Sequence, residues 1–235
     1  MVVEHMSFQI WQYKNKRRMV VLTVSLALLT ACGQVTVQPT LSSSVAIEAL
    51  EELGEIRRAP VHVGILIDQK LRDLVFRVER PVGVVGQAVY NVAAGRAIAA
   101  KLIKLASYQF EEISLVQDRQ NAPPLLLTVG LQQEQPGLTV DVARRGITAL
   151  YDVKTKIDLR LRATLHNRGE QIWVGTARVT EELQTGGLEG SGGAIDISRG
   201  ISESIDRATD RLVANLMRQV RRSASLKKYL EEQRQ

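Results

Sequence analysis

The clearest periodic pattern in the chain lies between residues 153 and 166, where apolar and polar side chains alternate position by position. Such alternation predicts a strand with one face on a core and the other in water. Asn167-Arg168-Gly169-Glu170 has the composition of a turn, and the alternation resumes over residues 171–183. This region therefore predicts a long antiparallel hairpin.

Shorter apolar runs predict further strands upstream of this hairpin. They cover residues 61–67, 74–78, 113–116, 125–132 and 138–142, and the run 74–78 is expected at a sheet edge. Pro136-Gly137 lies between the last two runs, and these turn residues favour a second hairpin.

Two longer segments carry apolar residues at helical spacing. The first runs from Gly86 to Tyr108, and only Arg96 interrupts its stripe. The second begins near Asp196 or Ser198, either of which can cap a helix. The two stripes consist of Val85, Val89, Val92, Ala99, Ile103 and Ala106, and of Ile197, Ile201, Ile205, Ala208, Leu212 and Leu216.

This order of elements predicts an α+β fold, in which two long helices pack on one face of a mainly antiparallel sheet. Residues 61–218 are expected to form one domain, followed by a basic helical tail over residues 219–235. Residues 32–60 read as a tether that contains a short helix from Ile47 to Arg58, which Pro60 ends.

Residues 1–31 have the pattern of a secretory leader. Lys14 to Arg18 is charged, and Met19 to Leu29 is apolar apart from Thr23 and Ser25. A helix of that length reaches about 16 Å, whereas a hydrocarbon core is about 30 Å thick. The first thirteen residues add nothing to such a signal, and the true start codon stays open, at Met6 or later.

The end of the leader, Leu29-Thr30-Ala31-Cys32, resembles the lipobox of bacterial prolipoproteins. The resemblance implies a diacylglycerol on the Cys32 thiol, cleavage before Cys32 and acylation of the freed amine. Several acyl chains, at about 0.8 kcal/mol per buried CH₂, form a durable anchor. Under the lipoprotein sorting rule of Gram-negative bacteria, Gly33 implies the outer membrane, with the protein facing the periplasm. The alternative is an ordinary signal peptide followed by a chance cysteine.

Charge and composition narrow the function classes. The chain carries a net charge of +6, of which the leader holds +3, so 27 basic and 24 acidic residues follow it. This mild excess, without aromatic residues interleaved in a basic run, argues against nucleic acid as a partner. Cys32 is the sole cysteine, so no internal disulfide forms.

No constellation for catalysis or metal binding is visible. His62 and His166 do not have metal-site spacing, and the glycine-rich stretch 185–194 lacks the Lys-Ser/Thr of a phosphate loop. No nucleophile elbow appears. The adjacent pairs Glu111-Glu112 and Glu181-Glu182 would diverge to opposite faces of a strand. The sequence thus predicts neither enzyme activity, nor a metal, nor a cofactor apart from the lipid on Cys32.

Two basic sets are candidate binding surfaces. A row on the long strand could bind an anionic ligand such as lipid headgroups or lipopolysaccharide, although the default interpretation is a solvated sheet face with weak salt links to Asp158. The C-terminal tail could touch a membrane or a partner helix, or be a solvated helix. The row is Lys154, Lys156, Arg160 and Arg162, and the tail set is Arg218, Arg221, Arg222, Lys227 and Lys228 with Leu226, Tyr229 and Leu230.

Residues 125–182 resemble the small outer-membrane lipoprotein family called YajG. The resemblance rests on Leu125-Leu126-Leu127-Thr128-Val129, on Ile157-Asp158-Leu159-Arg160-Leu161-Arg162-Ala163 and on Asn167-Arg168-Gly169-Glu170. The wider group shares an architecture with lipoproteins of the lipopolysaccharide-assembly and curli-secretion machines. The resemblance implies no enzyme activity.

Together these features predict a lipid-anchored outer-membrane lipoprotein that serves as a non-catalytic interaction or assembly component of an envelope complex. The alternative is an accessory of lipid, glycan or secretion transport that binds an anionic ligand through the basic sheet face. A hydrolase is a third hypothesis. The expected partners are the outer membrane and an envelope protein complex, and a homo-oligomer is compatible with the sequence.

Overall fold

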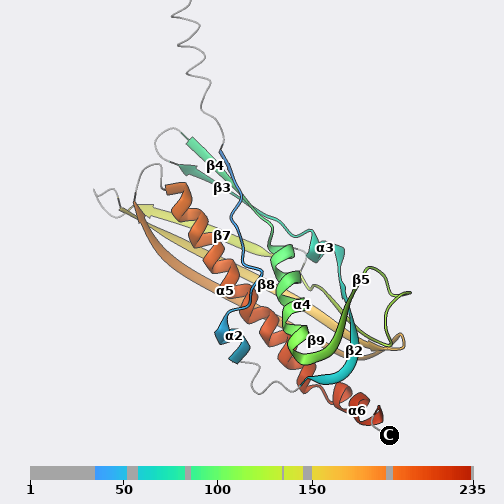
Figure 1. The fold of residues 1–235 in the computed structure, drawn as a ribbon. Helices are drawn as coiled ribbons and strands as arrows, with labels where there is room; N and C mark the ends of the chain where they lie inside the picture. Colours follow the sequence, from blue (N-terminus) through green and yellow to red (C-terminus); the bar gives the residue numbers. More distant parts are fainter. Residues whose placement is uncertain are drawn as a thin grey trace, which may run out of the picture.

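The fold is known from a computed structural model, which describes residues 35–51, 58–82, 86–133, 135–144, 150–188 and 193–233. Its longest strands are β8 (Leu150–Asn167) and β9 (Glu170–Leu188), which form the predicted antiparallel hairpin (Figure 1). Arg168 and Gly169 make the turn with φ values of 49° and 87°, as a two-residue hairpin turn requires. The odd-numbered side chains of β8 from Val153 to Leu165 are all fully buried, so the alternating pattern is confirmed.

The hairpin belongs to a six-stranded sheet of mixed direction. Four further strands complete it: β2 (Ala59–Ile67), β5 (Phe110–Val116), β6 (Leu125–Leu131) and β7 (Gly137–Arg144). Strand β2 runs parallel to both β5 and β6, whereas β6, β7 and β9 are antiparallel to β8.

The hairpin predicted across Pro136-Gly137 is wrong. Strands β6 and β7 do not pair with each other; they lie end to end along the same edge of β8. Strand β6 pairs with residues 161–167 of β8, and β7 pairs with residues 151–158. Strand β8 is long enough to accept two short strands in series, and no local pattern in those strands reveals this.

The first predicted helix is also corrected, because its N-terminal part is a strand. Strand β4 (Gly86–Val92) pairs with β3 (Phe76–Val82) and with β1 (Val35–Val37) in a three-stranded sheet. Ala88, Tyr90 and Val92 share one buried face of this strand, and Val89 on the opposite face is buried as well. A short apolar run of this kind does not distinguish a strand from a helix. Helix α4 (Ala94–Gln109) begins only after this strand. The predicted edge strand corresponds to β3, which lies at an edge of the small sheet.

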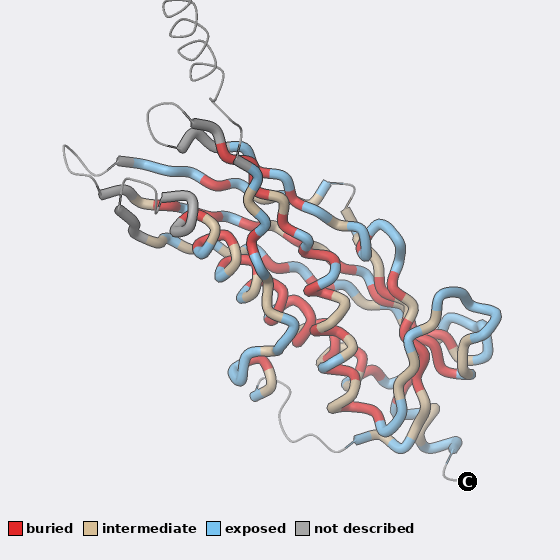
Figure 2. Tube along the Cα trace, turned by 45° about the horizontal axis from the view of Figure 1, so that its top comes forward, coloured by how far each residue is buried: buried red, intermediate tan, exposed pale blue. Residues whose placement is uncertain are grey.

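Helix α4 and helix α5 (Gly193–Arg222) pack against each other on one face of the large sheet, α5 over β8 and β9 and α4 beside β5 and β2 (Figure 1). The stripe of α5 that contains Ile201, Ile205, Leu212 and Leu216 is fully buried. Figure 2 shows this buried layer between helices and strands. The predicted α+β class with two long helices on a sheet is therefore confirmed. A short helix, α3 (Gln69–Arg72), packs against the start of α4.

The segments expected as a tether and a tail are parts of the fold where the structure describes them. Val37, Leu41, Val45 and Leu50 pack against the core, and helix α2 (Ile47–Glu51) lies on α5. At the other end, Val220 and Leu226 are buried, in α5 and in helix α6 (Ala224–Glu232) respectively. Apolar residues in both segments explain the difference, because they were too sparse to show a period.

Candidate functional site

A buried ion cluster joins the two long helices. Lys101 of α4 is 0% exposed, and its Nζ lies 2.9 Å from Oδ1 of Asp206 and 3.0 Å from Oδ1 of Asp210, both on α5. The same Nζ donates hydrogen bonds to the carbonyl oxygen of Asp206 at 3.1 Å and to Oγ1 of Thr209 at 2.9 Å. An unpaired ammonium would be very costly at this depth, so the two carboxylates make the buried lysine tolerable.

The same carboxylates hold the N-terminal segment, residues 35–51. The backbone N–H of Ser42 donates to both carboxylate oxygens of Asp206 at 3.1 Å, and the N–H of Ala46 donates to Oδ2 of Asp210 at 3.4 Å. Hydrogen bonds to ionised acceptors are stronger than neutral ones. The cluster therefore ties three parts of the chain together, namely α4, α5 and the N-terminal segment.

The electrostatics of the cluster are asymmetric because one ammonium faces two carboxylates. Burial raises the pKa of Asp210 above its ordinary value, and the charge of Lys101 opposes that rise. The nearby charge of Asp206 adds to the rise in pKa. Sequence reasoning missed this cluster. The available signals were the four-residue spacing of Asp206 and Asp210 on one helix face and a lysine between Ile98 and Leu105 in an apolar stripe.

The predicted basic row projects from the face of β8 opposite the helices, where acidic residues accompany it. Glu182 Oε1 lies 2.8 Å from Lys154 Nζ, and this contact raises the pKa of the lysine. Asp158 accepts hydrogen bonds from Arg178 Nε and Nη2, each at 3.1 Å, and these bonds lower the pKa of the carboxyl group. The structure thus sets Lys154, Lys156, Arg160 and Arg162 in a face of mixed charge.

The two histidines occupy unrelated positions. His62 Nε2 lies 3.0 Å from Ser114 Oγ, and its Nδ1 lies 3.6 Å from Glu112 Oε1, whereas His166 is buried at the end of β8. Among the residues that the structure describes, no group of three or more His, Cys, Asp or Glu side chains could hold a metal ion. Within the same residues, no helix is long and apolar enough to cross a membrane.

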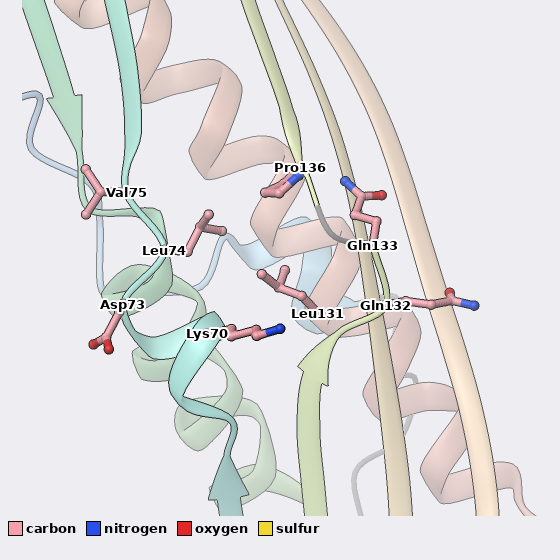
Figure 3. Close-up of a pocket in the computed structure, with 8 residues that line it drawn as sticks. All are labelled: Lys70, Asp73, Leu74, Val75, Leu131, Gln132, Gln133 and Pro136. Carbon is pink, nitrogen blue, oxygen red and sulfur yellow. The ribbon is translucent and has the colours of Figure 1, made fainter.

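Open grooves indent the surface that the described residues form. Two of them, of about 510 and 460 Å³, flank residues 73–75 and share those residues in their walls. In the first, Lys70, Leu74 and Leu131 lie in the gap and Asp73 points away from it (Figure 3). Neither groove brings together an acid and a base in hydrogen-bond contact among its described residues, so each could hold an apolar side chain but has no visible chemistry.

The third groove, of about 770 Å³, lies at the β5 edge of the large sheet. Its wall contains His62, Ser114, Pro123 and Leu115, whose side chain is 62% exposed. No described strand pairs with the outer edge of β5. The groove thus combines an open strand edge with an exposed apolar residue, which is an arrangement suited to an extended peptide.

The edge of β9 is different because helix side chains cover part of it. Gln219 Nε2 donates to the carbonyl oxygen of Thr176 at 2.9 Å, and Ser225 Oγ donates to that of Ile172 at 2.6 Å. Such capping protects an edge strand from pairing with another chain. Leu226 of the predicted basic tail is buried beside this edge, while Lys227 and Lys228 are exposed.

Cys32 and Gly33 lie outside the described residues, as do residues 189–192 of the glycine-rich stretch. The described chain begins at Val35, which pairs with Ala88 in the parallel β1–β4 ladder. The structure therefore does not show the predicted lipidation site, but it shows where the chain that follows it enters the fold.

Comparison with known proteins finds no matching family model and no matching curated protein. Among solved structures, the chain is similar to protein XCC0632 of Xanthomonas campestris, from the family DUF330, with 9% identity, 84% of this chain and 99% of that chain covered, and a TM-score of 0.45. It is similar to a neuraminyllactose-binding hemagglutinin homolog from Helicobacter pylori, with 12% identity, coverage of 82% and 96%, and a TM-score of 0.46. A minor lipoprotein from Acinetobacter baumannii matches with 11% identity, coverage of 71% and 92%, and a TM-score of 0.35.

Proposed function

We propose that this protein is an outer-membrane lipoprotein, anchored through acyl chains on Cys32 and facing the periplasm, that acts as a non-catalytic interaction component of an envelope complex. The lipobox residues support the anchor. The observation that carries the proposal is the open edge of β5, where exposed Leu115 lies beside a groove. The protein uses no cofactor other than its lipid.

The partner that fits this edge is an extended segment of another envelope protein. Unpaired backbone N–H and C=O groups of an edge strand give such a segment affinity, and a neighbouring pocket gives it side-chain specificity. The outer edge of β5 and the adjoining groove, which Leu115 lines, supply both features. The contrast with β9 supports the choice, because two of its edge carbonyls already accept bonds from helix side chains.

Processing and location test the anchor. In a Gram-negative host, the mature chain is expected to begin at Cys32 with added acyl mass, and to float with outer-membrane vesicles in a density gradient. Cys32→Ala should leave the protein unacylated and outside that fraction. A mature chain that starts elsewhere with a free thiol would refute the anchor.

Crosslinking tests the partner surface. A photo-reactive residue in place of Leu115 should crosslink to an envelope protein in intact cells, and Leu115→Asp should prevent that protein from co-purifying. The matched control is Val142 of β7, an exposed apolar residue on another strand, where no such crosslink is expected. Equal crosslinking at both positions would reject the β5 edge as the contact surface.

A transport accessory that binds an anionic ligand is the second candidate. Exposed Lys156 and Arg162 on the outward face of β8 favour it, although Asp158 and Glu182 share that face. Reversing Lys154, Lys156, Arg160 and Arg162 to glutamate should abolish binding to lipopolysaccharide or anionic vesicles if this function holds. Unchanged binding would exclude it.

A further inference from the structure

We propose that the anchor holds the molecule in a fixed orientation, with the end that carries β1 and the β3–β4 ends against the membrane and the β8–β9 turn directed away from it. This inference rests on the proposed lipid anchor at Cys32 and adds a lipid-facing surface to it. A flexible tether, as the sequence first indicated, would leave the domain free to turn.

The distance from Cys32 to the start of the folded chain is short. Three peptide links separate Cys32 from Val35, and a fully extended chain spans at most about 3.6 Å per residue, so the anchor lies within about 11 Å of Val35. Val35 pairs with Ala88, two residues from Gly86, at which β4 begins. By contrast, a free flexible tether over residues 32–60 would have an end-to-end distance of roughly 30 Å.

The N-terminal segment is held to the domain by several contacts. It pairs with β4 over three residues, and its Ser42 and Ala46 amides then bind the carboxylates of Asp206 and Asp210. Ala49 of α2 is buried against the core. The segment is therefore fixed at several points along its length. Among the described residues, no flexible joint separates the side of the chain that carries the anchor from the domain.

The anchored end and the β8–β9 turn lie at opposite ends of the molecule. Strand β8 spans seventeen residue steps, or about 55 Å, from Leu150 to the turn that follows Asn167. The start of β1, the β3–β4 ends and the N-terminal end of α5 all lie at the upper left of Figure 1, opposite the β8–β9 turn. The register places Leu115 in one row with Leu165, close to that turn. The partner edge would thus face the periplasm, far from the lipid surface.

Fluorescence quenching on lipid vesicles tests the orientation. The Cys32 thiol becomes a thioether in the acylated protein, so one introduced cysteine is the only site for a thiol-reactive dye. Glu79→Cys, in the row Thr36–Val89–Glu79 of the small sheet, reports the near end, and Glu170→Cys reports the turn. The full acylated chain is reconstituted in phosphatidylethanolamine–phosphatidylglycerol vesicles whose headgroups carry a nitroxide quencher.

Quenching at position 79 is expected to exceed that at position 170 roughly threefold or more, because the two sites differ in height by tens of ångströms. A twelve-residue Gly-Ser insertion between Gln34 and Val35 keeps the lipobox and should bring the two values together. Equal quenching without the insertion would overturn the orientation, as would a difference that survives it. If the protein does not sediment with vesicles and Cys32 stays open to alkylation, the anchor itself fails.

Discussion

Two sets of charges in this molecule use the same residue types in opposite settings. On the outward face of β8 and β9, Lys154 pairs with Glu182 and Arg178 pairs with Asp158 in contact with water. Between the helices, Lys101 meets Asp206 and Asp210 with no exposed surface of its own. Exposed pairs contribute little because solvent screens them, whereas breaking a buried pair leaves a charge that nothing compensates. Depth, rather than the number of charges, decides which set matters for the fold.

The largest effect is expected for Lys101→Met, which leaves the buried carboxylate of Asp210 and the half-buried carboxylate of Asp206 without their ammonium. The free energy of unfolding should fall by about 3–5 kcal/mol. Urea unfolding of the chain from residue 32, with Cys32→Ser, measures this loss. Lys156→Met on the exposed face is the matched control and should unfold as the parent does. A loss below about 1 kcal/mol for Lys101→Met would mean that water reaches the cluster.

Asp206→Asn should come next, and it should cost more than Asp210→Asn. Asp206 accepts a bond from Lys101 and one from the Ser42 N–H that its two oxygens share, and bonds to charged groups contribute about 1.5–3 kcal/mol each. Asp210→Asn should lower the free energy of unfolding less, because burial already raises the pKa of Asp210 and disfavours its charged form. The same urea titrations compare the two variants. The reverse order of stabilities would show that Asp210 is the main counter-ion.

The two settings should also differ in the sign of their pH dependence. The raised pKa of Asp210 means that the folded state binds this proton more tightly, so its contribution is complete below pH 3.8 and declines as pH rises through the folded value. The lowered pKa of Asp158 has the opposite effect, because its contribution is present above pH 3.8 and is lost as pH falls.

Urea titrations between pH 3 and pH 7 measure these slopes. Relative to the parent, Asp210→Asn should remove a decline in stability with rising pH, and Asp158→Asn should remove a loss at low pH. Slopes of the same sign for both variants would contradict the assigned pKa directions.

The smallest effect is expected for Arg178→Leu, which removes an exposed ion pair with Asp158. The unfolding free energy should change by no more than about 1 kcal/mol. A double-mutant cycle with Asp158→Asn isolates the pair, and added salt should reduce the coupling. A coupling as large as that of Lys101 with Asp206 would erase the distinction between the two settings.

The sequence predicts those parts of the fold whose signal is local. The alternation from Val153 to Leu165 and the turn at Arg168-Gly169 predict the hairpin, although its strands extend further at both ends. The stripe from Ile197 to Leu216 likewise predicts the second helix. Strand β4 was mistaken for helix because Val89 and Val92 are three residues apart, as in a helical stripe. Only its partners β3 and β1 settle the question. The placement of β6 and β7 in series depends on the length of β8, which their own residues do not encode.

The buried cluster could not be predicted because its contacts join distant parts of the chain. Lys101 and Asp206 lie 105 residues apart, and Ser42 and Asp206 lie 164 residues apart. Arg96 drew attention as the break in the helical stripe, although it is exposed and Lys101 is buried. Cys32, the predicted lipidation site, is the reverse case, because its sequence signal is strong but the residue lies outside the described part of the chain.

Amide hydrogen exchange at Ser42 is the most direct test that the buried cluster holds the N-terminal segment to the domain. In the parent protein, the Ser42 amide should exchange far more slowly than in an unstructured peptide, and Asp206→Asn should remove that protection while amides in the centre of β8 keep theirs. A Ser42 amide that exchanges at the rate of a free peptide in the parent protein would contradict the fixed N-terminal segment and the orientation built on it.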